Sequence, residues 1–372
     1  MRFYISQFDA LRAIQNVIGS TEKRDYMQIL SYVKIDTLDK KIKLTTTNLD
    51  MQSSDFANAE TESNFSFVAP IQTLLEIVKK MPDNSKILFE FNEKNNKLTI
   101  ESDKCKFEIG TLSVSDFPVM SETDYNSILK INAIDFLFCL RNTQFSMSNE
   151  DIKYNLNGIL IHSDEKEINC ISTDGHRLSC CSIANENNVE IANSIIPKKA
   201  VFEIIKILSL YQNDQVEIKL SEKKICISIK NITFVSKLID ASFPDYKKVI
   251  PLQNDKILEI NIKKLKNSIE RVSIVNMHSD NKGMLFNVTP NSLSISSTID
   301  SDAASETIDV KFSSDESMNI KYNFKYILDS INHINDENCV FKISNPENSI
   351  LITQKTPDSK KNLYFIIMPM RK

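Results

Sequence analysis

Residues 70–109, PIQTLLEIVKKMPDNSKILFEFNEKNNKLTIESDKCKFEI, decide the fold of this 372-residue chain because three diverged copies of this stretch are present. The copies begin at Pro70, Pro197 and Asn323, at intervals of 127 and 126 residues. In each copy apolar residues recur first at the three- and four-residue spacing of a helix, and then at the two-residue spacing of strands. Each copy therefore predicts a helix followed by strands.

A related pattern, a short strand followed by a helix, lies upstream of each copy. It begins at Ile5, Ile131 and Ile260. A unit of about 126 residues thus occurs three times, and each unit contains the strand-helix-strands pattern twice. The ends of the first two units share a Phe-Pro pair, at 117–118 and at 243–244. Three domains are predicted, over residues 1–125, 126–252 and 253–372.

The predicted elements indicate the fold class. Helices are predicted over residues 7–18, 70–81, 132–144, 197–211, 262–275 and 323–333. The strands between them mix Ile, Val, Lys and Thr, a composition typical of antiparallel sheets with one solvated face. With two helices per unit packed on one side of the sheets, the class is α+β. Sheet edges left unpaired at both ends of the chain favour a closed oligomer of several copies.

The composition is that of a folded soluble protein, with 41% apolar and 25% charged residues. No apolar run approaches the roughly 18 residues that a membrane helix needs. The N-terminal sequence MRFYISQFDALRA lacks the apolar core of a secretory signal because Gln7 and Asp9 interrupt it. We therefore expect a cytoplasmic protein that does not enter a membrane.

Cysteine, glycine and histidine usage excludes several classes of site. The seven cysteines contain no C-x-x-C pair and mostly lie among apolar residues, which indicates reduced thiols in the core. The five glycines form neither a G-x-G-x-x-G nor a Walker A loop, so the familiar nucleotide-cofactor enzymes are excluded. The four histidines lack the paired spacing of metal ligands. No cofactor and no metal are predicted.

Charge is unevenly divided between the predicted helices and the rest of the chain. The formal net charge is −4, but the six helical segments together carry +6, which leaves −10 elsewhere. Cationic helices suit contact with DNA phosphates, and an acidic remainder discourages unspecific adhesion. The alternative is that these lysines are solvated side chains without a partner.

The decapeptide ISTDGHRLSC has the residue types of an active site. A hydrolase would use His176 as base, Asp174 to orient it, and Ser172 or Ser179 as nucleophile. A catalytic triad needs groups that converge from separate segments, whereas these residues share one strand and turn. The structural interpretation is a tight turn with Gly175 at positive φ, beside the wall of a peptide-binding groove. A hydrolase remains the alternative function, and a repeat scaffold that does not bind DNA is a second one.

Three longer stretches carry a family resemblance. They are NGILIHSDEKEINCISTDGHRLSCCSI at 157–183, SFPDYKKVIP at 242–251 and YFIIMPMRK at 364–372. Together with LTTTNLDMQSS and DFPVM in the first unit, they resemble the bacterial β sliding clamp family, the processivity subunits of DNA polymerase III. The resemblance covers the whole chain.

The resemblance implies three repeated clamp domains, with antiparallel sheets outside and two helices per domain inside. Two copies would join head to tail as a homodimeric six-domain ring around double-stranded DNA, without sequence preference. Such a clamp is not an enzyme and has no 3'-5' exonuclease activity. The expected partners are the DNA polymerase III alpha subunit, the clamp loader delta subunit and other proteins with clamp-binding motifs. The expected location is the bacterial cytoplasm, at the nucleoid during replication.

Site residues follow from the resemblance by position, and none is catalytic or metal-binding. The peptide groove between the second and third domains would comprise Leu156, Thr173, Gly175, His176, Arg177, Leu178, Pro244, Lys248, Val249, Asn323, Tyr326, Ser349, Ile366, Ile367, Met368, Pro369, Met370 and Arg371. DNA would contact Arg24, Gln72, Glu150, Lys153, Tyr154 and Asn155, with Lys198 and Lys199 added on charge alone. The dimer contact would involve Phe107, Ile109, Val275 and Asn276. Gln72 and Glu150 depart from the arginine and glutamine often seen in the family.

Overall fold

The computed structural model describes residues 1–22, 27–121, 123–186, 188–356, 358 and 360–371. The chain forms two compact units. The first unit consists of Met1–Leu137 and Lys199–Leu238, and the second consists of Phe138–Lys198 and Ile239–Lys372. Each unit therefore combines residues from different sequence repeats.

The order of elements confirms the repeat. Apart from the two-residue strands β5 and β22, each third of the chain has the order strand, helix and three strands, twice over. The helices lie within one to three residues of the predicted ranges. They are α1 (Gln7–Val17), α2 (Ile71–Lys80), α3 (Ala133–Thr143), α4 (Lys198–Leu210), α5 (Ile262–Val272) and α6 (Phe324–Ile331).

Local chemistry determines where these helices begin. The side chains of Ser6, Asn261 and Asn323 cap α1, α5 and α6, each accepting a hydrogen bond from a backbone N–H in the first turn. Such caps satisfy amides that have no partner inside the helix. Pro70 and Pro197 directly precede α2 and α4, where a missing N–H has little consequence.

The first unit contains two sheets. A five-stranded sheet has the order β5-β1-β7-β8-β9, formed by Glu60–Thr61, Arg2–Ser6, Lys86–Asn92, Lys97–Ser102 and Cys105–Gly110. An eight-stranded sheet has the order β10-β15-β16-β17-β4-β3-β2-β6, formed by Ser127–Asn132, Gln215–Leu220, Lys224–Ile229, Ile232–Lys237, Met51–Asn58, Lys41–Thr47, Tyr32–Leu38 and Ser66–Pro70. Strand β17 of the second repeat pairs with β4 of the first, so the larger sheet continues across the two repeats.

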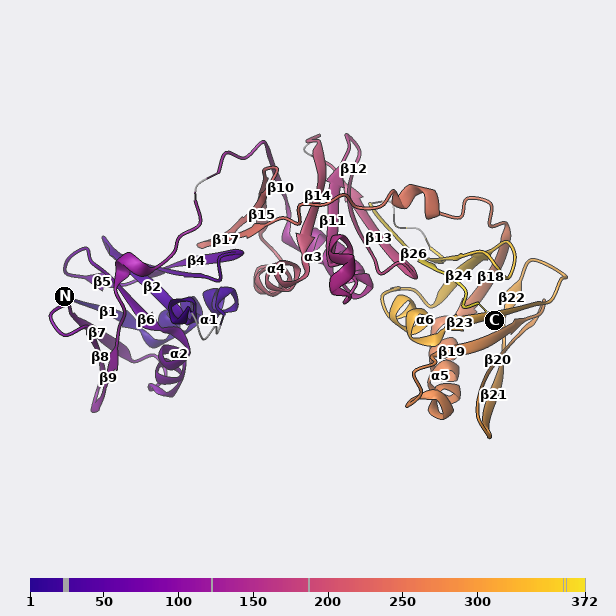
Figure 1. Ribbon diagram of the computed structural model, residues 1–372, viewed down its shortest axis with the longest axis horizontal. Coiled ribbons are helices and arrows are strands. Elements are labelled where there is room, and N and C mark those ends of the chain that lie inside the picture. The colour runs from indigo at the N-terminus through magenta and orange to yellow at the C-terminus, as the bar shows by residue number, and fades with distance from the viewer. Residues whose placement is uncertain (23–26, 122, 187, 357, 359, 372) are drawn as a thin grey trace. The chain divides into compact units, whose positions relative to one another are not determined.

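A hydrophobic core fills the space between the helices and sheets of this unit. Helices α1 and α2 contact each other, and Figure 1 shows them side by side. Ile14 and Leu74 from these helices join Phe3 and Phe67 from the strands in one buried cluster. The ring centroids of Phe3 and Phe89 stack at 4.9 Å. Burial of such side chains is the main source of stability in a unit of this kind.

The second unit also contains two sheets. A nine-stranded sheet has the order β14-β11-β12-β13-β26-β25-β24-β18-β22, formed by Ile191–Pro197, Gly158–Ser163, Glu167–Thr173, Arg177–Ala184, Lys361–Ile367, Ile350–Gln354, Asn338–Ile343, Lys256–Asn261 and Lys311–Phe312. A four-stranded sheet has the order β21-β20-β19-β23, formed by Asp302–Asp309, Ser292–Ile299, Gly283–Val288 and Met318–Asn323. Strand β13 of the second repeat pairs with β26 of the third.

These shared sheets explain why the compact units do not follow the repeats. The middle repeat contributes one sheet portion to each unit, through β17 and through β13. The predicted domain boundaries 1–125, 126–252 and 253–372 therefore describe sequence repeats, and as domain boundaries they stay a prediction. The named pairings between described strands are all antiparallel, which confirms the α+β class.

Two further expectations concern cysteines and membranes. Six of the seven cysteines are buried and all seven are free, whereas Cys105 is exposed on β9. The prediction of core thiols is therefore correct except at Cys105. None of the helices in the described part of the chain combines the length and apolar character needed to cross a membrane.

Candidate functional site

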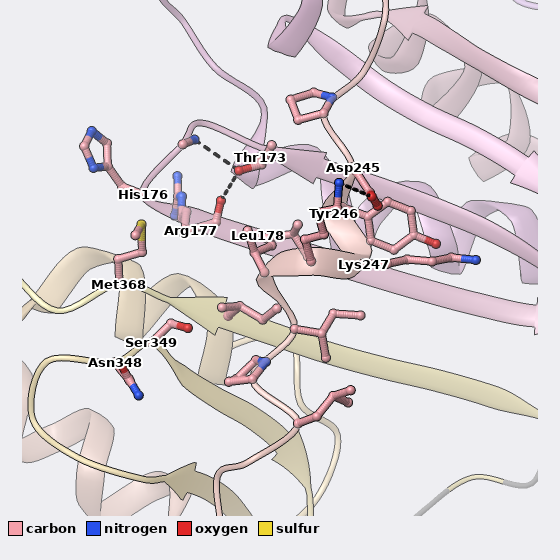
Figure 2. A pocket seen from close by; sticks show the side chains of 18 of the residues that line it. Thr173, His176, Arg177, Leu178, Asp245, Tyr246, Lys247, Asn348, Ser349 and Met368 are labelled. Carbon is pink, nitrogen blue, oxygen red and sulfur yellow. Dashed lines mark hydrogen bonds and ion pairs between the residues drawn. The ribbon is translucent and has the colours of Figure 1, made fainter.

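A pocket of about 730 Å³ lies in the second unit (Figure 2). Four segments form it: the end of the short helix Asp151–Leu156, the turn between β12 and β13, the linker 243–254 between β17 and β18, and the end of β26 with the neighbouring β24–β25 loop. Its lining residues are Leu156, Thr173, Gly175, His176, Arg177, Leu178, Phe243, Pro244, Asp245, Tyr246, Lys247, Lys248, Val249, Ile250, Pro251, Leu252, Gln253, Asn254, Glu347, Asn348, Ser349, Ile366 and Met368.

The turn between β12 and β13 is held by its own side chains. Thr173 Oγ1 donates to the Arg177 carbonyl at 2.6 Å and accepts from the Gly175 amide at 3.1 Å. Asp174 Oδ1 accepts from the amides of His176 and Arg177 at 2.9 and 3.0 Å. Gly175 has a φ of 91°, in the left-handed region that favours glycine. The predicted tight turn is confirmed.

An apolar floor lies beside this turn. Leu156, Leu178 and Ile366 are buried, yet each presents part of its side chain to the pocket. At the rim, Met368 and Val249 are 52% and 50% exposed. Apolar side chains that stay open to solvent in a concave site are typical of surfaces that bind other molecules.

The linker wall is anchored to the sheet beneath it. Within the short helix Tyr246–Val249, the Tyr246 hydroxyl is 2.9 Å from His162 Nε2 on β11. Burial raises the pKa of Tyr246 to about 12 and lowers the pKa of His162. Both side chains are therefore neutral near pH 7, and their hydrogen bond holds the linker against the strand.

The geometry contradicts a hydrolase at this turn. Ser172 Oγ donates to the Thr143 carbonyl, and Ser179 Oγ pairs with Ser146 Oγ at 2.6 Å. Both serines are fully buried, while His176 is exposed. The nucleophile and the base of the alternative mechanism therefore lie in different environments. In the described residues, no group of three or more His, Cys, Asp and Glu side chains could hold a metal ion.

Comparisons with known proteins identify the family. Residues 1–121, 130–245 and 247–371 match the N-terminal, central and C-terminal domains of the DNA polymerase III beta subunit. The beta sliding clamp of Rickettsia felis is 32% identical over 363 residues, 94% of each chain. The chain belongs to the bacterial β sliding clamp family. The clamp of Haemophilus influenzae is 29% identical over the full length of both chains.

Solved sliding clamps have the same fold. A DNA polymerase sliding clamp from Pseudomonas aeruginosa superimposes with a TM-score of 0.94 at 26% identity and covers 100% of both chains. A sliding clamp from Bartonella birtlesii bound to griselimycin gives a TM-score of 0.94 at 29% identity, again over 100% of both chains. The predicted membership is confirmed, and members of this family are non-catalytic processivity factors of DNA polymerase III.

The pocket brings together twelve of the eighteen groove residues predicted for this clamp. They are Leu156, Thr173, Gly175, His176, Arg177, Leu178, Pro244, Lys248, Val249, Ser349, Ile366 and Met368. The other six, Asn323, Tyr326, Ile367, Pro369, Met370 and Arg371, do not line it. Ile367 is fully buried between its neighbours in the sheet, and Asn323 caps α6. The Tyr326 ring lies 4.5 Å from the guanidinium carbon of Arg177, behind the groove wall.

Sequence reasoning missed eleven lining residues. Most belong to the linker, namely Phe243, Asp245, Tyr246, Lys247, Ile250, Pro251, Leu252, Gln253 and Asn254. The motif SFPDYKKVIP contains six of these, so treating the whole motif as groove would have found them. Glu347 and Asn348 come from the loop between β24 and β25, and no local pattern marks them.

Predicted DNA contacts of the clamp include the short helix Asp151–Leu156. Lys153 Nζ forms an ion pair with Glu150 at 3.1 Å, and both side chains are partly solvated. Tyr154 is 57% exposed. The Asn155 amide donates to the Ser242 carbonyl at 3.1 Å, so this side chain is engaged within the chain.

The remaining DNA candidates lie on or near other helices. Gln72 is exposed on α2, where it donates to Glu76 at 3.1 Å. Lys198 and Lys199 begin α4, and the side chain of Lys199 is 75% exposed. Arg24 lies outside the described residues.

One predicted dimer residue requires correction. Phe107 is 38% exposed on β9, the edge strand of the five-stranded sheet, and Ile109 on the same strand is partly buried. Val275 lies partly exposed in the short helix Ser273–Asn276. Asn276, by contrast, is fully buried, and its amide donates to the Gly283 carbonyl at 3.0 Å. The Asn276 side chain is hydrogen-bonded inside the chain and is therefore not available to a partner.

Proposed function

We propose that two copies of this chain form a head-to-tail ring of six domains that encloses double-stranded DNA and tethers DNA polymerase III to it. The domains would be the repeats 1–125, 126–252 and 253–372. A topological tether prevents dissociation without requiring a tight contact that would stop sliding. Phosphate contacts suit this task because they carry no sequence information.

The charge distribution supports DNA inside the ring. Helices α4 and α5 carry most of the excess positive charge of the helical segments, and Lys199, Lys263 and Lys264 are exposed on them. Exposed cations on a helical layer can follow the phosphate backbone as the ring slides. Lys153 and Tyr154 would add contacts at the rim. While the ring encloses DNA, the cytoplasmic protein would be associated with the nucleoid.

Exposed apolar groups support the dimer contact. Phe107 lies on an unpaired sheet edge in the first unit. Ile274 and Met277, which flank the predicted contact in the third repeat, are 65% and 55% exposed. An edge strand and apolar side chains of this exposure are usually covered by a partner. A head-to-tail arrangement would place the two surfaces against each other and close the ring.

The pocket of about 730 Å³ is the observation that carries the partner-binding proposal. Its apolar floor, its exposed Met368 and its polar lining residues, such as Lys248 and Ser349, suit a short peptide that is bound mainly by apolar side chains. The proposed occupants are segments of the polymerase alpha subunit, the clamp loader delta subunit and other proteins with clamp-binding motifs. They would compete because they use the same groove.

Griselimycin is a suitable probe, because a related clamp has been solved with this compound, and we propose that it occupies this groove. We expect the full-length chain to bind griselimycin and to stimulate DNA polymerase III on primed circular DNA. Met368→Ala should weaken both effects, and deletion of residues 368–372 should abolish them, while light scattering still reports the dimer. Val119→Ala is a matched control, because Val119 is 60% exposed and does not line this pocket. Unaltered polymerase stimulation after the deletion would refute the groove assignment.

A further inference from the structure

The groove turn has a counterpart in the first repeat. Thr47 Oγ1 donates to the Met51 carbonyl at 2.8 Å and accepts from the Leu49 amide at 3.1 Å. Asn48 Oδ1 accepts from the two amides that follow Leu49, at 3.0 and 2.8 Å. Leu49 has a φ of 77°. This hydrogen-bond pattern is the one found in residues 173–177, which lie 126 positions later.

The two equivalent turns border cavities of very different size. The pocket beside Leu49 has a volume of about 150 Å³, against about 730 Å³ beside Gly175. The turn alone therefore does not produce a groove. The last residue of the turn differs chemically between the two sites, since the first repeat has Met51, which is buried, and the second has Arg177.

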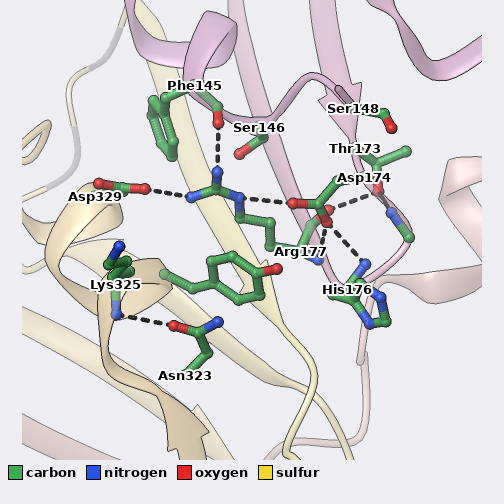
Figure 3. A network of polar contacts seen from close by, with 12 residues as sticks. Phe145, Ser146, Ser148, Thr173, Asp174, His176, Arg177, Asn323, Lys325 and Asp329 are labelled. Carbon is green, nitrogen blue, oxygen red and sulfur yellow. Dashed lines mark hydrogen bonds and ion pairs between the residues drawn. The ribbon is translucent and has the colours of Figure 1, made fainter. Parts of the chain in front are cut away.

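The Arg177 guanidinium is bound to its own turn and to two other segments of the chain (Figure 3). Its Nε donates to Asp174 at 3.0 Å, and its two terminal nitrogens donate to Asp329 and to the Phe145 carbonyl, each at 2.5 Å. The guanidinium carbon lies 4.5 Å from the Tyr326 ring and 5.3 Å from the Phe145 ring. Only 12% of the Arg177 side chain is exposed. Its planar face and every one of its nitrogens are thus engaged within the chain.

We propose that Arg177 positions the peptide groove instead of binding the peptide with its guanidinium, and that Asp329 is a positioning residue of the same site. Asp329 does not line the pocket and belongs to α6 of the third repeat. Through Arg177 it holds that helix against the turn from the second repeat. This inference rests on the proposed function of the groove.

The contact between Arg177 and Asp329 influences the pocket through the two residues next to Arg177 in the sequence, His176 and Leu178. Leu178 forms part of the floor, and the His176 carbonyl accepts a hydrogen bond from the Met368 amide at 2.9 Å. If Arg177 loses its anionic partner on α6, its long side chain gains alternative rotamers, and the orientation of both neighbours is less well defined. Binding of a ligand then costs the additional entropy of ordering them.

A double-mutant cycle tests this coupling. The variants are Asp329→Ala, Arg177→Met and the two combined, and the measurement is the affinity for labelled griselimycin. Arg177→Met should preserve the turn, because the first repeat forms the same turn with Met51. We expect each single variant to weaken binding by roughly three- to tenfold, with the lower end favoured because the Asp329 side chain is 43% exposed. The double variant should be no weaker than Arg177→Met alone.

Controls separate positioning from general damage. Glu270→Ala removes an exposed carboxylate from α5, away from the pocket, and should leave the affinity unchanged. Light scattering and thermal unfolding should show intact dimers for every variant. Additive losses in the double variant, an unchanged affinity in Asp329→Ala, or a loss that follows a lowered melting temperature would each overturn the proposal. Failure of the wild-type chain to bind griselimycin would instead overturn the groove function on which the proposal depends.

Discussion

Replacing Gly175 by alanine should destabilise the second compact unit by about 1 kcal/mol while leaving its groove open. At a φ of 91° a residue with a Cβ atom is strained, at a cost of about 1–2 kcal/mol. Alanine also restricts the unfolded chain, which offsets roughly 0.4–1 kcal/mol. The added methyl group would meet no close neighbour, since Lys153 Nζ at 3.9 Å is the nearest atom within reach. The loss is therefore conformational and involves no steric clash.

The expected change is measurable by calorimetry. For a unit of roughly 200 residues, 1 kcal/mol corresponds to a lowering of the melting temperature by about 2–4 °C. The transition of the first unit should stay in place, because its equivalent turn carries Leu49 and is unaffected. Griselimycin affinity should change by less than about twofold, since the methyl group meets no pocket atom and the remaining turn hydrogen bonds are retained.

Gly175→Asn is the matched control because asparagine tolerates positive φ better than alanine does. We expect this variant to melt between the wild type and Gly175→Ala. An alanine variant with the wild-type melting temperature would refute the claim that backbone strain is the dominant effect. An asparagine variant as unstable as the alanine variant would show that any side chain at this position is harmful.

Three further predictions concern pH, assembly and DNA. Burial lowers the pKa of His333, which stacks on Phe145. The neutral imidazole therefore contributes stability above the ordinary histidine pKa of about 6.5, and this contribution is lost as the pH falls below that value. His333→Gln should make the melting temperature of the second unit less dependent on pH between about 5 and 7. Phe107→Asp places a charge in the proposed dimer contact and should shift the mass measured by light scattering from twice 42.5 kDa toward the monomer. Lys198→Ala with Lys199→Ala should weaken DNA retention at low salt, and should reduce the slope of log affinity against log salt by about 0.9 for each phosphate that the variant no longer neutralises.

The sequence alone was sufficient to predict the helices and strands and their threefold repeat. Helical and strand periodicities are local, and they predicted all six helices to within a few residues at each end. The positive φ of Gly175 followed from the local pattern Asp-Gly in the same way. These features depend on residues that are close in sequence, and the preferences of such residues can be read without knowing their tertiary contacts.

The burial of single polar residues could not be predicted from the local sequence pattern. The family resemblance placed Asn276 at the dimer contact because of its position beside Val275. Its amide is bonded to the Gly283 carbonyl, and its side chain is buried behind a strand that begins seven residues later. Whether a polar side chain faces a partner or its own backbone depends on how the helix end packs, which local sequence does not specify.

The sequence by itself determined the strands, the helices and the tight turn at Asp174-Gly175. The tertiary structure alone decided how the sheets continue from one repeat into the next, and which of two equivalent turns opens into a large groove. The physical reason is that these outcomes depend on pairings between distant segments, such as β13 with β26 and Arg177 with Asp329, which is 152 residues away. Local propensities allow the same turn before Met51 and before Arg177. Only the tertiary contacts of these two residues show which turn borders the large groove.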